Sequence, residues 1–287
     1  MVKILIIIVL ILVFLYLFAI KPRLFFRPDK SQLTGVLYAH RGLHDNQTDA
    51  PENSLRAFEK AVEKGFGIEL DVQLSKDRIP VVFHDYTLDR ICGQKGKVCD
   101  YTLEELKQFK LCNSEQTIPS FSEVLQLVRG RVPLIIEYKV EYTDVSVCKL
   151  SNELLMNYNG EYCIESFNPL ALMWYRIHCS HIVRGQLSEE FYKNKELRHP
   201  IHYILAGLLF NFATCPDFVA YNHRHKHNLS RVLTHVLYRC TQAAWTIRSQ
   251  TELDSNQKSF DTFIFDSFLP DGESIENARK RAEGVRL

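Results

Sequence analysis

The chain has 287 residues, of which 46% are hydrophobic and 24% charged, a composition typical of a folded globular protein. Its formal net charge is +1, which excludes a broad electrostatic attraction to nucleic acid, so no nucleic-acid partner is expected. The length suits a single α/β barrel, which needs about 250 residues.

The first segment differs from the rest, because Ile4–Ile20 contains no charged residue. As a helix it would extend about 25 Å, enough to cross a thin hydrocarbon core. A signal peptide would offer a small-residue cleavage site after the apolar run, and a buried soluble helix would show a polar face, for which only Tyr16 is available. The sequence therefore predicts a single-pass membrane anchor within residues 1–30, followed by one folded domain at 31–287.

Positive charges indicate how this anchor is oriented. Lys3 precedes the predicted span, and four cations follow it: Lys21, Arg23, Arg27 and Lys30. The positive-inside rule then places the large C-terminal part in the cytoplasm. The eight cysteines contain no C-x-x-C pair, so they do not predict a zinc ribbon, and reduced thiols agree with a cytoplasmic domain.

Strand-like and helix-like runs alternate along the rest of the chain. The predicted strands lie at 36–40, 67–73, 132–138, 161–166, 181–187, 217–221, 243–247 and 262–266. Between them, Ser54–Lys64 carries apolar residues at helical spacing, and capping boxes begin at Thr102 and Ser120. This alternation favours a TIM-type (β/α)8 barrel. The alternative, an open doubly wound sheet, would place a glycine-rich phosphate loop after an early strand, and the sequence has none.

The connection between the second and third strands is long and predicts a small insertion at about 75–118. Lys76–Arg78 has the character of a turn between Leu70–Leu74 and Pro80–His84. If these two runs pair as an antiparallel hairpin, His84 returns beside Glu69 and Asp71. The remainder of the connection is expected to form a subdomain over the barrel mouth.

Acidic side chains follow two of the predicted strands. Glu69 and Asp71 are two residues apart, so both point to the same face of a strand, which is the interior of a barrel. Unpaired carboxylates are costly there, and a bound cation would remove that cost. Glu137 on the next barrel strand adds a third oxygen ligand, and such a set predicts Mg²⁺ or Ca²⁺. The alternative is a buried ion network with Arg41 and Lys139.

Two histidines and two cations accompany these acids. His40 and His84 each follow an apolar run, and their proximity to a metal site would suit a general base and a general acid. Arg41 suits bidentate contact with phosphate, and Lys139 suits a point charge on it. Together with the metal ligands, these groups predict cleavage of a phosphodiester.

Three further features carry weaker predictions. Tyr221 and Trp245 lie at or near the ends of the sixth and seventh strands, where they are candidates for lining a substrate pocket, and core packing is an equal alternative for Trp245. The apolar run Ile201–Phe212 is too short to span a bilayer. It fits either a buried helix or an apolar lid in contact with the membrane surface.

The polar residues occur within short segments of fixed order: Ala39–Gly42, Ala50–Ser54, Gly67–Val72, Val81–Asp85 with Leu88–Arg90, and Ile136–Lys139. Weaker matches follow at Ser166–Asn168 and Ala244–Ile247. In this order and spacing the chain resembles the glycerophosphodiester phosphodiesterase family over about residues 35–270.

The resemblance implies a TIM-type barrel with a small insertion after its second strand. It also implies metal-dependent hydrolysis of glycerophosphodiesters, small molecules derived from phospholipids, to an alcohol and glycerol 3-phosphate. The roles of metal ligand, acid/base pair and phosphate contact would fall on the seven residues assigned to them above. Glu52, within the Pro-Glu-Asn element, is implied to support the first histidine loop and is a possible pocket residue.

Some positions depart from the family's usual pattern. Arg248 stands where family members often have Asn, and the last strand ends in Phe265–Phe268 where Thr-Asp-x-Pro is usual. These departures lie on the substrate side of the barrel, so they leave the predicted chemistry in place and the exact substrate open. Two alternatives to the implied function are also kept. One is a membrane-anchored enzyme of the lysophospholipase D type, and the other is a non-catalytic module that binds phosphodiesters.

Overall fold

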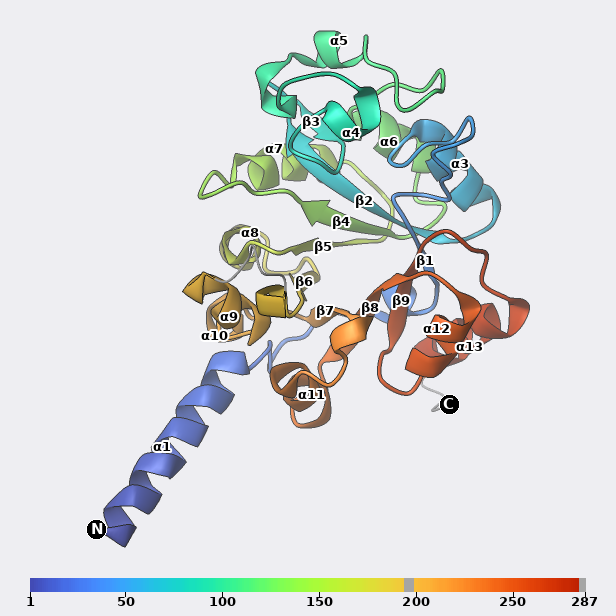
Figure 1. Cartoon of the computed structure of the whole chain (residues 1–287). Coiled ribbons are helices and arrows are strands. Elements are labelled where there is room, and N and C mark those ends of the chain that lie inside the picture. The colour runs from blue at the N-terminus through green and yellow to red at the C-terminus, as the bar shows by residue number, and fades with distance from the viewer. Residues whose placement is uncertain (194–198, 284–287) are drawn as a thin grey trace.

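The computed structural model of the protein describes residues 1–193 and 199–283, except for the side chains of Gln32 and Ala282. Eight parallel strands form a closed barrel surrounded by helices (Figure 1). The strands are β1 (Tyr38–His40), β2 (Gly67–Leu74), β4 (Leu134–Tyr138), β5 (Tyr162–Ser166), β6 (Arg184–Ser188), β7 (Phe218–Asn222), β8 (Thr241–Ile247) and β9 (Thr262–Phe265). Their order is β1-β9-β8-β7-β6-β5-β4-β2, and pairing of β1 with β2 closes the ring. The predicted TIM-type barrel is confirmed.

The helices follow the strands in the predicted alternation. They are α2 (Ser31–Thr34), α3 (Leu55–Glu63), α6 (Phe121–Val128), α7 (Ser146–Leu155), α8 (Pro169–His178), α9 (Pro200–Ala206), α10 (Asn211–Thr214), α11 (Leu229–Val236), α12 (Gln250–Asn256) and α13 (Gly272–Ala282). Side-chain caps fix where several of them begin. Ser54 caps α3, and Ser120 forms a capping box with Glu123 at the start of α6.

Alternate residues along each strand face two different cores. Ile68, Leu70 and Val72 of β2 pack in the outer core, which lies between the barrel and its helices. The inner core fills the barrel with residues of opposite phase: Tyr38, Ile135, Cys163, Leu187, Phe218, Ala220, Ala243 and Ile264. Glu69 and Asp71 share this inward phase, as the strand period of two predicted.

The insertion after β2 begins with the predicted hairpin. β3 (Pro80–Val82) pairs antiparallel with β2, placing Val82 opposite Val72. The chain continues through α4 (Asp89–Cys92), a 3₁₀ turn (Val98–Asp100) and α5 (Leu103–Leu106), which Thr102 caps as predicted. These elements share a small apolar core of their own: Val81, Phe83, Leu88, Ile91, Val98, Leu106, Leu111 and Ile118. His84 follows β3 directly and is therefore carried by this insertion.

The run Ile201–Phe212 forms the end of one short helix and the start of another. α9 ends before Gly207, and Leu208 has a left-handed backbone conformation (φ 55°) that prevents the helix from continuing into α10. Ile201, Tyr203 and Phe212 keep 36%, 52% and 40% of their surface exposed. The prediction of a buried helix therefore holds only for the inward side of this segment.

The N-terminal helix α1 (Val2–Ile20) projects away from the barrel (Figure 1). It is long and apolar enough to cross a membrane, and a signal sequence has the same properties. Its last turns are attached to the barrel domain. Tyr16 hydrogen-bonds Ser230 at 2.8 Å, the Tyr238 hydroxyl donates to the carbonyl of Leu17 at 2.8 Å, and the rings of Phe18 and Phe212 lie 5.7 Å apart.

Candidate active site

Three buried carboxylates gather inside the barrel at the ends of two neighbouring strands. Asp71 on β2 lies in register with Glu137 on β4, and Glu69 lies one inward-facing position earlier on β2. One oxygen from each of the three acids lies within 4.8 Å of the others, and each residue is at most 6% exposed. The structure therefore brings together the three predicted metal ligands.

Burial and mutual repulsion shift the pKa values of these three acids. Burial raises the pKa of Glu69 well above its ordinary range, and the charges of Asp71 and Glu137 raise it further. Burial also raises the pKa of Glu137, although Lys139 opposes the shift. Burial would raise the pKa of Asp71 as well, but the charges of Lys139, His84 and Arg41 hold it well below its ordinary range. An all-oxygen set of this kind fits a hard divalent cation.

Lys139 and Arg41 lie against the same acids. The Lys139 ammonium is 2.9 Å from an Asp71 oxygen and 2.7 Å from Glu137, and the Arg41 Nε is 3.4 Å from Asp71. These are the ion pairs that the ion-network alternative expects. Three carboxylates nevertheless face two cations, one of which is shared with Glu52, so negative charge remains in excess. The ion pairs and a bound cation are therefore compatible.

A tight turn after β1 directs Arg41 back toward this cluster. Arg41 has a φ of 56°, and its backbone N–H donates to Glu69 at 3.2 Å. Gly42 follows with a φ of 82°, and a Cβ there would lie 2.8 Å from the backbone of Ala57. Glycine is therefore required at position 42, because any side chain would collide with α3.

His40 is oriented by a carboxylate from the last barrel strand. Its Nδ1 lies 3.3 Å from Asp266, and its Nε2 lies 4.0 Å from Glu69. Burial lowers the pKa of His40 to about 4, although the hydrogen bond with Asp266 opposes that shift. The ring is therefore neutral near pH 7 and able to accept a proton at Nε2. Asp266 also contacts His44, whose Nε2 is 3.2 Å away.

His84 also has a carboxylate partner. Its Nδ1 lies 2.6 Å from Asp85, and Asp85 is in turn held by Arg90 at 2.6 Å. The hairpin returns His84 to the predicted metal ligands, because β3 pairs with β2 and the backbone N–H of the preceding Phe83 donates to the carbonyl of Asp71 at 2.9 Å. In each histidine the carboxylate at Nδ1 leaves Nε2 as the atom able to exchange a proton with a substrate.

Glu52 is hydrogen-bonded to Arg41, the predicted phosphate contact. One of its oxygens accepts from Arg41 at 2.6 Å, and both accept from Arg90 at 2.8 Å. Burial alone would raise the pKa of Glu52, but the hydrogen bonds from Arg90 and the charge of Arg41 lower it to about 2. Glu52 is 4% exposed and supports Arg41 through this hydrogen bond. Its place as a pocket residue stays a prediction.

The two predicted aromatic pocket residues point in opposite directions. Tyr221 packs in the outer core, and its hydroxyl donates to the carbonyl of Ala206 at 2.9 Å. The prediction that Tyr221 lines the pocket is therefore wrong, because it has the outward phase on β7. Trp245 has the inward phase on β8, packs partly buried against the inner core, and meets Phe167 edge to face at 5.5 Å.

Two polar residues near the cluster escaped the sequence analysis. Glu165 on β5 lies in register with Glu137 on β4. It is 1% exposed, and one of its carboxylate oxygens has no hydrogen-bond partner among the described residues. Burial raises its pKa well above the ordinary range, and the charge of Glu137 adds to that shift. The signal was present, since Glu165 follows the buried Cys163 at the strand period of two. His44 had no comparable signal, because it lies in a loop.

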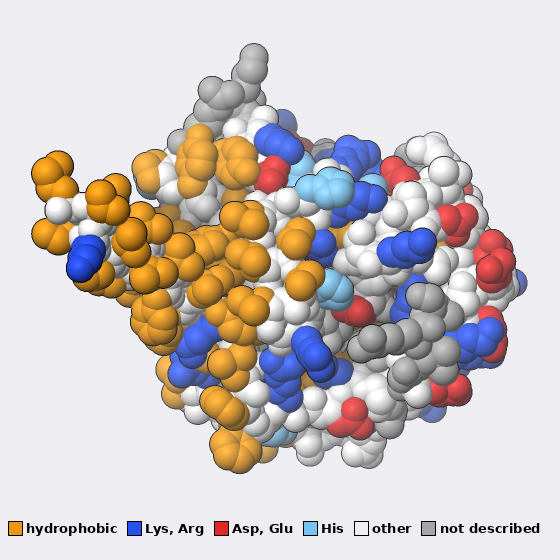
Figure 2. Space-filling model, turned by 90° about the horizontal axis from the view of Figure 1, so that it is seen from below, with side chains coloured by type: hydrophobic (Ala, Val, Ile, Leu, Met, Phe, Trp, Pro, Cys, Tyr) orange, Lys and Arg blue, Asp and Glu red, His pale blue; other side chains and the backbone are white. Residues whose placement is uncertain are grey.

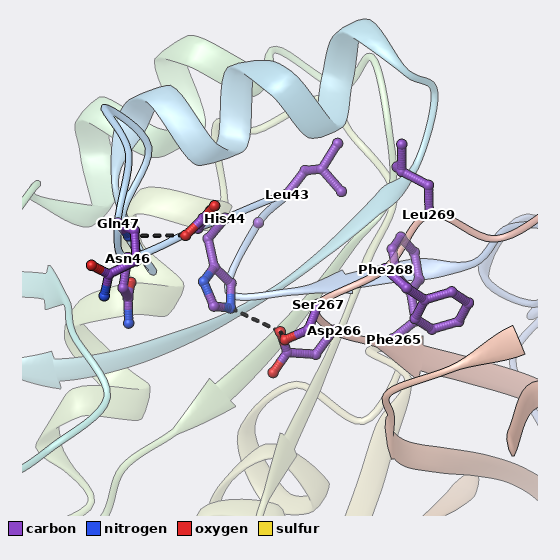
Figure 3. Close-up of a pocket in the computed structure, with 11 residues that line it drawn as sticks. Leu43, His44, Asn46, Gln47, Phe265, Asp266, Ser267, Phe268 and Leu269 are labelled. Carbon is purple, nitrogen blue, oxygen red and sulfur yellow. Dashed lines mark hydrogen bonds and ion pairs between the residues drawn. The ribbon is translucent and has the colours of Figure 1, made fainter.

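A cavity of about 670 Å³ is lined by Asp266, the carboxylate that contacts His40, while His40 itself is not among its lining residues. It is lined by the loop after β1 and the loop after β9, and Figure 3 shows the His44 ring directed at Asp266 between them. Asn46 and Gln47 supply polar groups on one side, while Phe268 and Leu269 supply apolar surface on the other. The cavity therefore offers both hydrogen bonds and apolar contact beside Asp266, the carboxylate partner of His40.

Comparisons with known proteins identify the family of the chain. The sequence profile of the glycerophosphoryl diester phosphodiesterase family matches residues 40–266. A glycerophosphodiester phosphodiesterase of Caldanaerobacter subterraneus is 34% identical over 164 residues, which cover 53% of this chain and 66% of that protein. One from Bacillus altitudinis is 44% identical over 112 residues, covering 37% of this chain and 44% of that protein. The matched segments thus span 44% to 66% of the length of these relatives.

Solved structures share the fold at low sequence identity. An Oleispira antarctica phosphodiesterase in complex with the product sn-glycerol-3-phosphate has a TM-score of 0.65 and 22% identity, over 87% of this chain and 97% of that one. A glycerophosphodiester phosphodiesterase from Thermotoga maritima has a TM-score of 0.60 and 21% identity, over 87% and 98%. Because the family profile covers most of the barrel, this chain belongs to the glycerophosphoryl diester phosphodiesterase family.

Proposed function

We propose that the protein is a metal-dependent phosphodiesterase that hydrolyses glycerophosphodiesters to an alcohol and glycerol 3-phosphate. The observation that carries this proposal is the buried cluster of Glu69, Asp71 and Glu137, flanked by two histidines that each have a carboxylate partner. Relatives named glycerophosphodiester phosphodiesterases and a related fold bound to sn-glycerol-3-phosphate support the substrate class.

The chain's own charges prepare the site for a phosphodiester. Glu69, Asp71 and Glu137 would hold Mg²⁺ or Ca²⁺, which supplies positive charge to a phosphate oxygen when bound. Arg41 and Lys139 lie against the same acids and offer donors to the remaining oxygens. Glu52 and the turn at Gly42 keep Arg41 in place, so little reorganisation is needed on binding.

The environments of the two histidines suit different roles. His40 is half-buried, its lowered pKa of about 4 leaves the ring neutral at pH 7, and its Nε2 is then able to take a proton from the nucleophile. The Nδ1 of His84 lies 2.6 Å from Asp85 and its side chain is one third exposed, a geometry that leaves Nε2 free to donate a proton to the leaving alkoxide. We therefore assign His40 as the general base and His84 as the general acid.

A hydrolysis assay tests the proposal directly. The full chain in detergent is treated with EDTA, and Mg²⁺, Ca²⁺ or Mn²⁺ is then restored in separate reactions with glycerophosphocholine and glycerophosphoethanolamine. Metal-restored release of glycerol 3-phosphate is the expected result. A folded protein that binds these compounds without turnover under any metal would refute the proposal and favour the non-catalytic binding module.

A second candidate substrate is a lysophospholipid that still carries one acyl chain. A row of aromatic rings leads away from Trp245 at the barrel interior: Phe167 at 5.5 Å, then Phe191 at 5.6 Å, then His202 of α9 at 5.8 Å. This row connects the mouth of the barrel with the exposed apolar residues of α9. If these rings hold the acyl chain, the protein should release lysophosphatidic acid from lysophosphatidylcholine. Phe191→Ala should then reduce this activity and leave hydrolysis of glycerophosphocholine unchanged.

We also propose that residues 1–30 anchor the protein in a membrane, with the domain at 31–287 in the cytoplasm. α1 provides the span, and the cations that follow it support this orientation. Cys99 is exposed on the insertion and provides a probe of sidedness. A membrane-impermeant maleimide should leave Cys99 unlabelled in intact cells and label it after lysis. Labelling in intact cells would place the barrel outside.

A further inference from the structure

An apolar surface surrounds the point where α1 leaves the barrel domain. We call it the anchor face, and it consists of exposed side chains on three segments: Phe25, Phe26, Phe212, Leu229, Val236 and Leu237. Phe212 contacts the ring of Phe18, and α11 is joined to α1 through Tyr16. Figure 2 shows hydrophobic side chains continuing from α1 onto this part of the domain, with Lys and Arg side chains around them.

Helix α11 buries polar residues and exposes apolar ones, which is the reverse of an ordinary surface helix. Its buried residues are polar, namely Ser230, Arg231 and Thr234, whereas Leu229 and Val236 are 63% and 70% exposed. A helix in contact with water on its outer side has the opposite arrangement. The pattern therefore indicates that an apolar medium covers the outer side of α11.

The length of α1 points to the same medium. Residues 16–20 pack against the domain, which leaves only Val2–Leu15 as a bare helix. That segment rises about 21 Å, at about 1.5 Å per residue. A typical hydrocarbon core is about 30 Å thick. The bare part of α1 that the structure describes is thus shorter than such a core, and entry of the anchor face into the bilayer would reduce the distance left to cross.

Charge around the anchor face is strongly one-sided. Between His199 and Thr251 the sequence contains one acidic residue, Asp217, which is buried and lies 3.6 Å from Arg23. No acidic residue occurs in residues 1–28. Arg27 and Arg239 are exposed beside the end of α11, where Arg27 donates to the carbonyl of Tyr238 at 3.0 Å. These cations complement anionic lipid headgroups.

We propose that the anchor face lies in the interfacial region of a bilayer that contains anionic phospholipids, so that the barrel domain is docked on the membrane in a fixed orientation. The proposal rests on anchoring by α1 and adds a second contact, made by α10, α11 and the segment that contains Phe25 and Phe26. It does not depend on the identity of the substrate or on catalysis.

Quenching by brominated lipids tests this contact on the full chain in nanodiscs. Leu229→Trp and Leu237→Trp place a fluorophore on the anchor face. Tyr142→Trp serves as the matched control, because Tyr142 is 81% exposed after β4, on the side of the insertion. Leu10→Trp within α1 reports insertion of the anchor. Fluorescence of both anchor-face variants should fall when phosphatidylcholine is replaced by its brominated form, while that of the control stays unchanged.

The outcomes separate docking from anchoring. Quenching of Leu10→Trp without quenching at positions 229 and 237 would overturn the docking proposal, whether water or a second copy of the chain covers the face. If Leu10→Trp is also unquenched, anchoring itself fails. Added phosphatidylglycerol should deepen the quenching at position 237, and Arg27→Glu combined with Arg239→Glu should abolish that increase. Quenching that is indifferent to phosphatidylglycerol would overturn the anionic-lipid part.

Discussion

Replacing Glu52 by Gln would remove one negative charge and keep the shape of the side chain. The Glu52 carboxylate accepts four hydrogen bonds, one from Arg41, two from Arg90 and one from Asn46. The difference between its ordinary pKa of 4.5 and its folded-state pKa of about 2 corresponds to about 3 kcal/mol of stability. Because Arg90 is half exposed, solvent screening reduces the expected loss to about 2 kcal/mol.

This loss should depend on pH in a defined direction. The pKa of Glu52 is lower in the folded protein, so its contribution is complete above pH 4.5 and declines as the pH falls toward 2. Urea unfolding of the full chain in detergent, followed by circular dichroism at pH 7, 5 and 3, measures it. The free-energy difference between wild type and Glu52→Gln should be the same at pH 7 and 5 and smaller at pH 3.

A matched control exists on the surface of α3. Glu59 also lies 2.6 Å from an arginine, Arg56, but it is 46% exposed. The same substitution at Glu59 should cost less than about 0.5 kcal/mol, because exposed ion pairs contribute little. Equal losses for Glu52→Gln and Glu59→Gln, or a loss at Glu52 that does not change between pH 7 and 3, would refute the reasoning. Glu52→Gln should also lower kcat/KM, because Arg41 loses its support.

Three further predictions concern the site itself. His84→Ala should lower kcat by about 100- to 10,000-fold with an unchanged unfolding temperature, since the ring is one third exposed, and activity above a tenth of wild type would contradict its role. Asp266→Asn should shift the acidic limb of the kcat/KM profile to lower pH, because Asp266 favours protonated His40, and an upward shift would count against this contact. Metal at 100 times its Kd should stabilise the EDTA-treated protein by about 2.7 kcal/mol. In a thermal unfolding assay Glu137→Gln should reduce this stabilisation, and equal stabilisation of the variant and the wild type would exclude Glu137 as a ligand.

The sequence predicted the parts of the site that follow from strand geometry. Glu69, Asp71 and Glu137 could be grouped because side chains alternate along a strand and neighbouring parallel strands end at the same edge. His84 could be placed because the turn at Lys76–Arg78 predicts a hairpin. Their catalytic and metal-binding roles stay predictions, since the structure shows only that they lie together.

The parts that the sequence did not predict depend on which side chains of a strand face into the barrel and on contacts between distant residues. β7 is apolar on both faces, so nothing in the run 217–221 shows that Tyr221 points outward and Ala220 inward. The contact of Asp266 with His40 joins residues 226 positions apart, and it depends on closure of the barrel between β9 and β1. The break between α9 and α10 depends on a left-handed residue that is not a glycine.

The location of His84 on the insertion has a mechanical consequence. The predicted metal ligands belong to β2 and β4 within the barrel, whereas His84 follows β3, which packs into the insertion's separate apolar core. The insertion is tied to β2 at this point by Gln73, whose amide donates to the carbonyls of Phe83 and Asp85. The position of His84 relative to the carboxylates therefore depends on how the insertion sits against β2. The insertion also carries Arg90, which donates to Glu52, the residue that supports Arg41. A shift of the insertion would therefore reach both the predicted proton donor and the predicted phosphate contact.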